Sequence, residues 1–387
     1  MRIVDLSLVY NTELVSPEEQ LHRHYTTVCM AEALSRLGAE VICLKRFSRD
    51  YTTTINEVAY HFVRDGFGHH ARNHQFPRRL YRLLRSLQPD VLHFHHLSLA
   101  VHSQLIRALL PKSAVLVIQH HGGPIIDSWK KRVHDRLNRV ADGFLFTTAE
   151  DGNRWFRQAA MQAKVFPVME GSPVFDFETR DRNYAGKYED RMVMRRQTGL
   201  AGDPVFLWNG RLDENKDPIT VLRGFEILAR EVPGAKLYLV YAEEKLLASV
   251  QEHIKSSAVL ADHVKLLGRV ERNELEKIYA SADYFVLGSH YEGTCYSLSE
   301  ALRAGCIPIV PNIPAFRAMT AQGRLGGLWK NGDAASFAET AKALLQQPKR
   351  ALAENCIQFF REQLSYDAIA KRMLEIYREL AEKKKAR

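Results

Sequence analysis

Short apolar runs alternate with segments of helical periodicity along the first half of the chain. In residues 21–37 and 76–87, apolar positions recur every three to four residues, which predicts helices that bury one face. The apolar runs between such segments are typical of strands, and they occupy residues 2–6, 41–44, 91–94, 114–119, 143–147 and 164–168. Strands that alternate with helices predict βαβ units and a parallel sheet covered by helices on both faces.

The same alternation starts again after a polar stretch, residues 170–203, in which we predict one short helix near 190–198. The second series of strands occupies residues 205–208, 236–241, 264–266, 283–287 and 306–310, and its helices occupy residues 219–231, 245–256, 273–280 and 297–304. The tail, residues 351–387, is predicted to be helical, with an apolar face formed by Ile369, Met373, Ile376, Tyr377 and Leu380. The pattern therefore predicts an α/β protein with two doubly wound, Rossmann-like parallel sheets.

A chain of 387 residues is too long for one ordinary core, which agrees with a division into two domains. We place a first Rossmann-like domain at 1–170, a linker at 171–203, a second Rossmann-like domain at 204–364 and a terminal helix at 365–387. Ligands of such sheets bind outside the carboxyl ends of the strands, so functional residues are expected there.

The composition is that of a soluble globular protein, with 46% hydrophobic and 26% charged residues. No apolar run approaches the roughly 20 residues of a membrane span, and the first residues predict a strand instead of a signal peptide. The five cysteines are scattered, odd in number and form no CxxC pair. This usage favours a reducing cytoplasm over a disulfide or zinc framework, so we expect a cytoplasmic protein.

The charge balance is basic, with 54 Lys and Arg against 45 Asp and Glu, or +9. Such a balance suits an anionic partner, but it is also common as a solubility charge, and charge alone leaves both readings open. The predicted helix at 76–87 is strongly basic on the side away from its leucines. We expect the leucines to pack on the sheet; the alternative is peripheral contact with an anionic membrane surface.

The first strand of the second series runs into a turn that carries two cations. Gly210 makes the turn, Asp217 is a candidate N-cap, and Pro218 fits the first helical position. Arg211 and Lys216 would then flank a helix N-terminus, where a guanidinium, an ammonium and free backbone N–H groups bind an anion. The alternative is that the two cations only pair with the nearby carboxylates of Asp213, Glu214 and Asp217.

Two carboxylates, Glu292 and Glu300, stand eight residues apart across the start of the helix predicted at 297–304. A carboxylate only accepts hydrogen bonds and can take both hydrogens of a vicinal diol. Glu300 on the helix suits the diol of a ribose, and Glu292 in the preceding loop suits the hydroxyls of a sugar. Arg211 and Lys216 would stabilise the charge of a leaving diphosphate without a metal, so the four residues together indicate a nucleotide diphospho-sugar site.

Histidines stand at the ends of two strands of the first half. His93 and His95 end one strand and share a face, because alternate side chains of a strand do so. His120 and His121 follow another strand, and a histidine at such a place can hydrogen-bond a sugar or an acceptor hydroxyl. A zinc site is disfavoured because the spacings fit no closed tetrad, whereas a core position for His95 and His121 stays open.

Several motifs carry a resemblance to a known family. They are NGRL and KDP within residues 209–218, LGRV at 267–270, YASAD at 279–283, EG and EALRAG within 292–305, and the tail segments 364–367 and 376–377. In these segments the chain resembles the retaining glycosyltransferases of family 4, also described as glycosyl transferases group 1. The resemblance implies the GT-B fold, in which two Rossmann-like domains face each other across a cleft and a C-terminal helix crosses back to the first domain.

The resemblance also implies which residues act. The donor-binding set would be Gly210, Arg211, Lys216, Arg269, Val270, Glu292, Gly293, Thr294, Cys295, Tyr296 and Glu300. In it, Arg211 and Lys216 would bind the diphosphate. Glu300 would bind the ribose, Glu292 the donor sugar, and the segment 269–270 the base. The histidines on the acceptor side or against the sugar would be His95, His120 and His121, and the catalytic candidates would be His121, Glu292, Arg211 and Lys216.

The chain departs from the family pattern at two places. The loop after the first strand, residues 11–18, lacks the family's glycine pair, which leaves open whether its backbone touches the donor. Residues 294–297 read TCYS where the family commonly has GFGL, which leaves the donor sugar open.

The expected reaction is transfer of a hexose from a UDP- or GDP-sugar to an acceptor hydroxyl, with retention at the anomeric carbon and with no metal or other cofactor. The acceptor would be a glycan, a lipid-linked sugar or a small molecule, in polysaccharide or glycolipid synthesis. No residue presents itself as a covalent nucleophile. The alternatives are a nucleotide-sugar epimerase, a phosphorylase of the same fold, or a non-catalytic sugar or nucleic-acid binder. Nucleic acid is disfavoured because glutamates in an anion site repel a polyphosphate chain.

Overall fold

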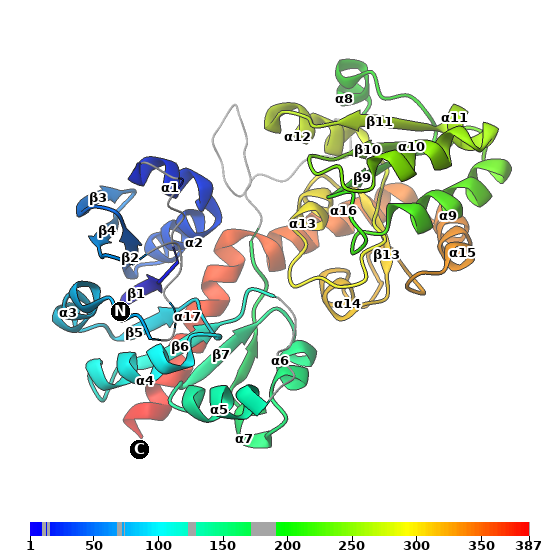
Figure 1. Cartoon of the computed structure of the whole chain (residues 1–387). Helices are drawn as coiled ribbons and strands as arrows, with labels where there is room; N and C mark the ends of the chain where they lie inside the picture. Colours follow the sequence, from blue (N-terminus) through cyan, green and yellow to red (C-terminus); the bar gives the residue numbers. More distant parts are fainter. Residues whose placement is uncertain are drawn as a thin grey trace. The chain divides into compact units, whose positions relative to one another are not determined.

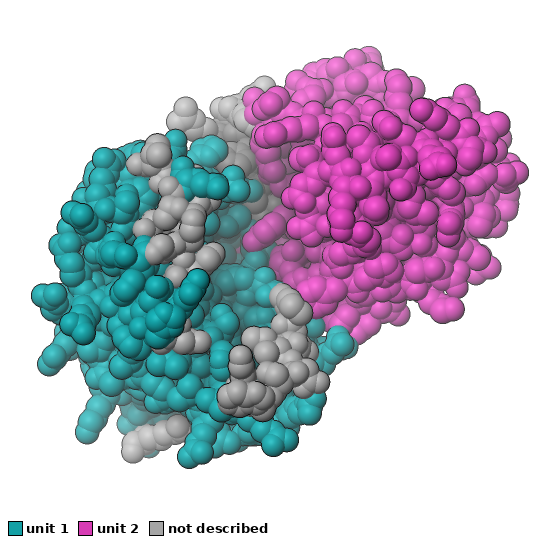
Figure 2. Space-filling view, viewed as in Figure 1, with its two compact units in different colours: residues 1–173, 366–387 teal, residues 174–365 magenta. Residues whose placement is uncertain are grey.

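The computed structural model describes residues 1–9, 13, 16–67, 72, 74–122, 129–171 and 191–386. The chain divides into two compact units, which Figure 2 shows in different colours. Unit 1 comprises Met1–Pro173 and Tyr366–Arg387, and unit 2 comprises Val174–Ser365. Most of the expected linker, residues 171–203, lies outside the described residues, and its predicted helix is α8 (Arg191–Thr198).

Within the described residues, unit 1 contains a sheet of eight strands in the order β3-β4-β2-β1-β5-β6-β7-β8. These are β1 (Arg2–Ser7), β2 (Glu40–Phe47), β3 (Tyr51–Ile55), β4 (Val58–Arg64), β5 (Val91–Phe94), β6 (Val115–Gln119), β7 (Gly143–Phe146) and β8 (Val165–Pro167). All neighbours pair in parallel except β3 and β4. The sequence-based prediction missed this hairpin, whose turn residues Asn56 and Glu57 have φ of 47° and 66°. Positive φ at both turn positions gives the twist that joins antiparallel strands, but Asn-Glu is not one of its usual signals.

The helices of unit 1 are α1 (Pro17–Arg23), α2 (Tyr25–Arg36), α3 (Arg78–Leu87), α4 (Ala100–Leu109), α5 (Trp129–Asn138), α6 (Ala149–Trp155), α7 (Ala159–Gln162) and α17 (Tyr366–Lys385). The single helix expected at 21–37 is wrong, because the chain leaves helical geometry at His24. The first helix starts earlier than expected. The Ser16 hydroxyl accepts from Glu19 N at 3.0 Å and the Glu19 carboxylate accepts from Ser16 N at 3.3 Å, which is a capping box.

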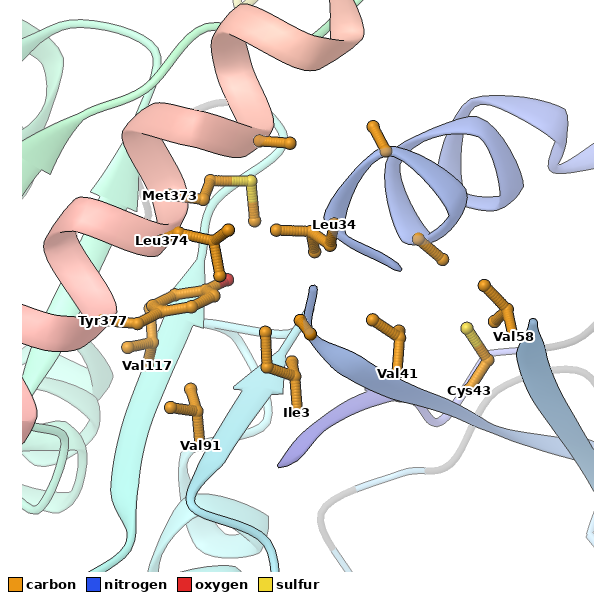
Figure 3. Close-up of a cluster of buried hydrophobic side chains, with 14 of the residues drawn as sticks. Ile3, Leu34, Val41, Cys43, Val58, Val91, Val117, Met373, Leu374 and Tyr377 are labelled. Carbon is orange, nitrogen blue, oxygen red and sulfur yellow. The ribbon is translucent and has the colours of Figure 1, made fainter. Parts of the chain in front are cut away.

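Helices bury both faces of this sheet, as the continuous apolar strands predict. Along β6, Val115 and Val117 belong to one core cluster, whereas Leu116 and Ile118 belong to the cluster on the opposite face. The helices α2 and α17 cover the first face. The predicted apolar face of the tail is confirmed, since its five residues are buried there. Figure 3 shows Met373, Leu374 and Tyr377 of α17 gathered with Leu34 and strand residues.

We expect Leu374→Ala to destabilise unit 1 by about 2–5 kcal/mol, because it removes a buried side chain from this cluster and leaves a cavity. The matched control is Leu105→Ala on α4, whose side chain is 37% exposed. Hydrogen exchange in urea, followed on peptides from β1, β5 and β6, would measure the loss. Equal effects from the two substitutions would show that α17 does not contribute to this core.

The helix α3 packs its leucines into the cluster on the other face, with Leu80 and Leu84 buried. Packing on the sheet, the interpretation preferred from the sequence, is therefore confirmed. The arginines at 78, 79, 82 and 85 are exposed. Leu83 and Leu87 are partly buried against the same cluster, so contact of this helix with a membrane would rely mainly on charge. Among the helices that the structure describes, none has the length and hydropathy needed to cross a membrane.

In the described part of unit 2, six parallel strands lie in the order β11-β10-β9-β12-β13-β14. They are β9 (Val205–Asn209), β10 (Lys236–Val240), β11 (Val264–Gly268), β12 (Tyr284–Val286), β13 (Ile307–Pro311) and β14 (Gly327–Trp329), of which β14 was not predicted. The strand order reverses direction between β9 and β12. A doubly wound sheet forms its ligand crevice at such a switch point, beside the carboxyl ends of the two strands.

The helices of unit 2 are α8, α9 (Pro218–Glu231), α10 (Leu247–Lys255), α11 (Ala258–His263), α12 (Arg272–Ser281), α13 (Tyr296–Arg303), α14 (Pro314–Met319), α15 (Ala334–Leu345), α16 (Lys349–Phe359) and the π-helical segment η2 (Phe360–Leu364). The tail expected as one helical stretch is interrupted at Ser365, which has extended backbone. There the chain leaves unit 2 and re-enters unit 1 with α17.

Candidate active site

The loop after β9 presents Lys216 beside the start of α9. Asp217 is the N-cap, as predicted: its carboxylate accepts from Thr220 N at 3.1 Å, and Pro218 is the first helical residue. Asp213 Oδ1 accepts from Lys216 N at 2.9 Å and closes the turn before the cap. The loop ends and the helix begins here because Asp217 is a favourable N-cap and Pro218 is favourable as the first helical residue.

The loop after β12 is tied to this turn by contacts that the sequence did not reveal. His290 N donates to Asn215 O at 2.8 Å, and Asn215 Nδ2 donates to Tyr291 O at 3.0 Å. Gly288 permits the approach, since a Cβ there would lie 2.5 Å from Asp217 O. The two loops follow adjacent strands at the switch point, so these contacts fix the position of Glu292 relative to Lys216.

Lys216 and Glu292 form an ion pair of 2.5 Å between Nζ and Oε1, with side chains only 12% and 10% exposed. Burial by itself would lower the pKa of Lys216, but Cys295 and the Glu292 carboxylate raise it above its ordinary value. The ammonium therefore stays charged. Removing either partner would leave an uncompensated charge in a buried place.

Arg211 fits the alternative interpretation. Its Nε donates to Asp213 Oδ2 at 2.8 Å, and its side chain is 52% exposed. The positive charge of Arg211 nevertheless lowers the pKa of Lys216 slightly. The Glu292 carboxylate has the stronger effect and raises that pKa. Arg211 is thus near the pair and solvent-accessible.

Glu300 lies on α13, as predicted, and its carboxylate is nearly buried. Arg272, which the sequence did not single out, donates from Nη2 to Glu300 Oε1 at 2.6 Å. The hydroxyl of Tyr279 accepts from Asn209 Nδ2 at 2.7 Å. Burial, and then the charge of Glu300, raises the pKa of this hydroxyl well above its usual value. Glu300 is therefore held from the α12 side, beside the carboxyl end of β9.

The other predicted donor residues surround these groups. Cys295, the N-cap of α13, is buried, and burial followed by the charge of Glu292 raises the pKa of its thiol to about 11. The half-buried positions of the two loops are Gly210, Gly293 and Thr294, and the more exposed Tyr296 begins α13. Arg269, exposed, and Val270, half-buried, follow β11. Lys216 and Glu292 thus directly contact each other, whereas Glu300 is held separately by Arg272.

Unit 1 carries a second polar cluster. His95 Nε2 and Asp5 Oδ2 are 2.6 Å apart, and His95 Nδ1 lies 2.8 Å from His121 Nε2. His121 Nδ1 in turn contacts Glu170 Oε1. Asp5 lies within β1, and the other three residues follow the carboxyl ends of β5, β6 and β8, of which β6 and β8 are separated by β7. We call this series of four residues the histidine row. The sequence singled out its histidines but neither carboxylate.

The remaining histidines of these strands are in different surroundings. The ring of His93 stacks on His95, as the strand alternation predicts, and its Nδ1 lies 2.9 Å from the Tyr377 hydroxyl. Burial lowers the pKa of His93 to about 3. His120 packs against Phe146 and Trp155, and burial lowers its pKa to about 4. Both imidazoles are therefore neutral at neutral pH.

The acidic and imidazole atoms of Asp5, His93 and His95 lie within 4.8 Å of one another, a spacing that a metal ion can bridge. In this structure Asp5 and His95 are joined directly by a 2.6 Å hydrogen bond, so the cluster forms a hydrogen-bond network.

Sequence profiles of two families match the chain. The family described as "Glycosyl transferases group 1" matches residues 190–363, and "Glycosyltransferase Family 4" matches residues 25–165. The two ranges together take in most of both units.

Individual relatives match over parts of their length. Mannosylfructose-phosphate synthase of Agrobacterium fabrum is 35% identical over 31% of this chain and 28% of that protein. GDP-mannose:cellobiosyl-diphosphopolyprenol alpha-mannosyltransferase of Xanthomonas oryzae is 22% identical over 66% of this chain and 64% of that protein. The chain thus spans less than two thirds of the length of these curated relatives.

Solved structures match nearly the whole chain. A glycosyltransferase from Rickettsia africae has a TM-score of 0.72 at 15% identity, with 98% of each chain covered. HepE of Anabaena, in complex with UDP and glucose, has a TM-score of 0.68 at 15% identity, with 98% of this chain and 100% of that chain covered. These likenesses confirm the predicted GT-B fold. With both family profiles matched and their motifs placed at the strand ends, the chain belongs to the family 4, or group 1, glycosyltransferases.

Proposed function

We propose that this protein transfers a hexose from a nucleotide diphospho-sugar to an acceptor hydroxyl, with retention at the anomeric carbon. The observation that carries the proposal is the buried pair of Lys216 and Glu292 at the switch point of unit 2, with Glu300 nearby on α13. A buried cation beside a helix N-terminus suits a diphosphate, and two carboxylates beside it suit the diols of a nucleotide-sugar.

In the proposed donor complex, Lys216 and the exposed Arg211 bind the diphosphate. The diphosphate gains negative charge as the glycosidic bond breaks, so a fixed ammonium stabilises the transition state more than the ground state. Glu292 has a second carboxylate oxygen with which to accept from sugar hydroxyls. Glu300, held by Arg272, accepts from the ribose.

We propose that Lys216 and Arg211 stabilise the leaving diphosphate and that the transfer is metal-independent. No residue of the site is proposed as a covalent nucleophile. The leaving diphosphate would take the proton of the acceptor hydroxyl on the same face of the sugar. Isolation of a glycosyl-enzyme adduct from a slow substrate would contradict this mechanism.

The proposed donor is a UDP- or GDP-sugar. One relative carries GDP-mannose in its name, and one structural neighbour is described with UDP and glucose. The acceptor side is proposed to be the strand ends of unit 1, where His121 is 43% exposed. The acceptor would be a glycan, a lipid-linked sugar or a small molecule.

A thermal-shift screen with UDP-, GDP- and ADP-sugars, with EDTA present, tests donor binding. We expect one nucleotide series to raise the melting temperature of wild type, and to raise that of Lys216→Met by a smaller amount. Release of nucleoside diphosphate that depends on an added acceptor would then support transfer. Acceptor-independent conversion of the sugar would instead indicate an epimerase, and a requirement for inorganic phosphate would indicate a phosphorylase. Absence of any shift across the panel would overturn the proposal.

A further inference from the structure

The histidine row links one side chain of β1 and three side chains that follow β5, β6 and β8 by three consecutive hydrogen bonds. They join Asp5 to His95, His95 to His121, and His121 to Glu170. The two imidazole rings are nearly parallel, with 22° between their planes. Asp5 and His95 are largely buried, and the row becomes more exposed at His121.

The number of protons in the row follows from its geometry. Each of its three hydrogen bonds needs one proton between its two heavy atoms, so the row holds three protons. Ionised carboxylates only accept, so the outer ring nitrogens, His95 Nε2 and His121 Nδ1, each carry a hydrogen. The third proton lies between His95 Nδ1 and His121 Nε2. Two imidazoles with three protons on four nitrogens carry one positive charge between them.

The surroundings favour that single charge. Burial raises the pKa of Asp5, but the charge of His95 and its hydrogen bond lower it well below its usual value. Burial lowers the pKa of His121, but the charge and hydrogen bond of Glu170 raise it overall. Among the described residues, the other charged or titratable groups that act on the row include Cys43 and Lys45 of β2, Tyr60 of β4, His93 of β5, His120 after β6 and Tyr377 of α17.

We propose that Asp5 and Glu170 are positioning residues that make His95 and His121 share one proton, so that the pair presents a single positive charge at the strand ends of unit 1. The inference rests on the proposed function for its kinetic consequence, because His121 is placed there on the acceptor side. Both ring nitrogens of His121 are engaged in the row. A substrate oxygen that binds His121 therefore replaces Glu170 or His95 as the partner of one N–H.

The shared proton gives the row a defined pH range. Loss of one proton leaves two lone pairs facing each other across the 2.8 Å contact between the rings, and gain of a fourth places two N–H groups there. Either change breaks the contact. The two limits belong to the pair and not to one histidine. We expect a bell-shaped pH dependence of kcat/KM for the acceptor.

The test compares Glu170→Gln and Asp5→Asn with the control Glu382→Gln, an exposed glutamate on α17 of the same unit. Ring ¹⁵N spectra across pH count the imidazole protons, and spectra of His95→Gln and His121→Gln assign the two rings. A neutral amide no longer stabilises the shared charge. In Glu170→Gln the loss of the shared proton and the alkaline limb of kcat/KM should therefore move down by about one pH unit or more. The control Glu382→Gln should shift neither the loss of the shared proton nor the alkaline limb of kcat/KM.

The spectra need no substrate, so they separate this inference from the proposed function. A wild-type spectrum in which His95 and His121 titrate as two independent imidazoles overturns the inference even if transfer is observed. The inference is also overturned if Glu170→Gln and its control Glu382→Gln shift the titration of the histidine row equally. Coupled loss of one shared proton in wild type supports the inference even if no tested donor is turned over, and that result would count against the proposed function alone.

Discussion

The Lys216→Met variant is expected to lower kcat/KM for the nucleotide-sugar by about 10²- to 10³-fold. This is the usual effect of removing one fixed hydrogen-bond donor from a site where negative charge develops. Methionine keeps the length of the side chain and removes the ammonium. We call the loops after β9 and β12 the donor loops. Lys216 is their buried cation, and its partner Glu292 follows the adjacent strand. Most of the loss should appear in kcat, because the diphosphate carries more charge in the transition state than in the bound donor.

The same substitution has a second effect that must be separated from the first. It leaves the Glu292 carboxylate buried without its cation, which costs about 3–5 kcal/mol in comparable buried pairs. The double variant Lys216→Met/Glu292→Gln removes both charges and should recover most of the stability of unit 2 to urea. It should not recover turnover. The matched control is Lys245→Met, whose ion pair with Glu214 is 66% and 64% exposed and should matter little to either measurement.

Two results would end this assignment. One is a double variant with wild-type turnover. The other is a Lys216→Met variant whose rate falls only as far as the loss of folded protein predicts. Steady-state kinetics at a temperature where every variant is folded distinguishes a catalytic loss from an unfolding loss.

The donor loops could be predicted from the sequence because their signals are local. Asp217 and Pro218 end a loop and start a helix by their own chemistry, and Glu300 falls on a helix whose apolar spacing is regular. The contact between Lys216 and Glu292 spans 76 positions, yet it follows from topology. Once β9 and β12 are neighbours at a switch point, their carboxyl ends place the two loops together.

The supports of those loops depend on three-dimensional packing and carry no such local signal. Arg272 reaches Glu300 because α12 and α13 lie beside each other. Asn215 bonds to the backbone of a loop after another strand, so its role depends on the final approach of the two loops. Gly288 did offer a signal. A glycine directly after a strand suggests a close backbone approach, and here a Cβ would meet Asp217 O.

The first unit was predicted less completely for the same reason. The hairpin β3–β4 has a partly exposed first strand and an atypical turn, so neither alternation nor turn chemistry revealed it. Asp5 lies in the middle of a buried strand, where a carboxylate needs a partner, and that was the missed signal for the histidine row. Glu170 could not be paired with His121 from sequence, because the partnership depends on the neighbouring positions of β6, β7 and β8.

The Glu300→Gln variant is expected to raise KM for the donor by roughly 10- to 100-fold while changing kcat much less. A hydrogen bond to a charged group contributes about 1.5–3 kcal/mol, and an amide oxygen accepts more weakly than a carboxylate. The proposed contact is with the ribose, away from the bond that breaks, so it should hold the bound donor and the transition state equally. The control is Glu274→Gln on α12, a half-buried glutamate whose side chain is 42% exposed and pairs with Lys277.

A donor that lacks one ribose hydroxyl gives the sharper test of Glu300. In wild type, the 2′-deoxy or the 3′-deoxy form of the donor should raise KM, because the deleted hydroxyl can no longer donate to the carboxylate. In Glu300→Gln the same deletion should cost much less, since the stronger acceptor is already gone, and the two effects should be strongly non-additive. Additive effects would mean that Glu300 and the ribose do not meet. The partner of Arg272 would then be a structural carboxylate, and the ribose would have to be held by another group of the donor loops.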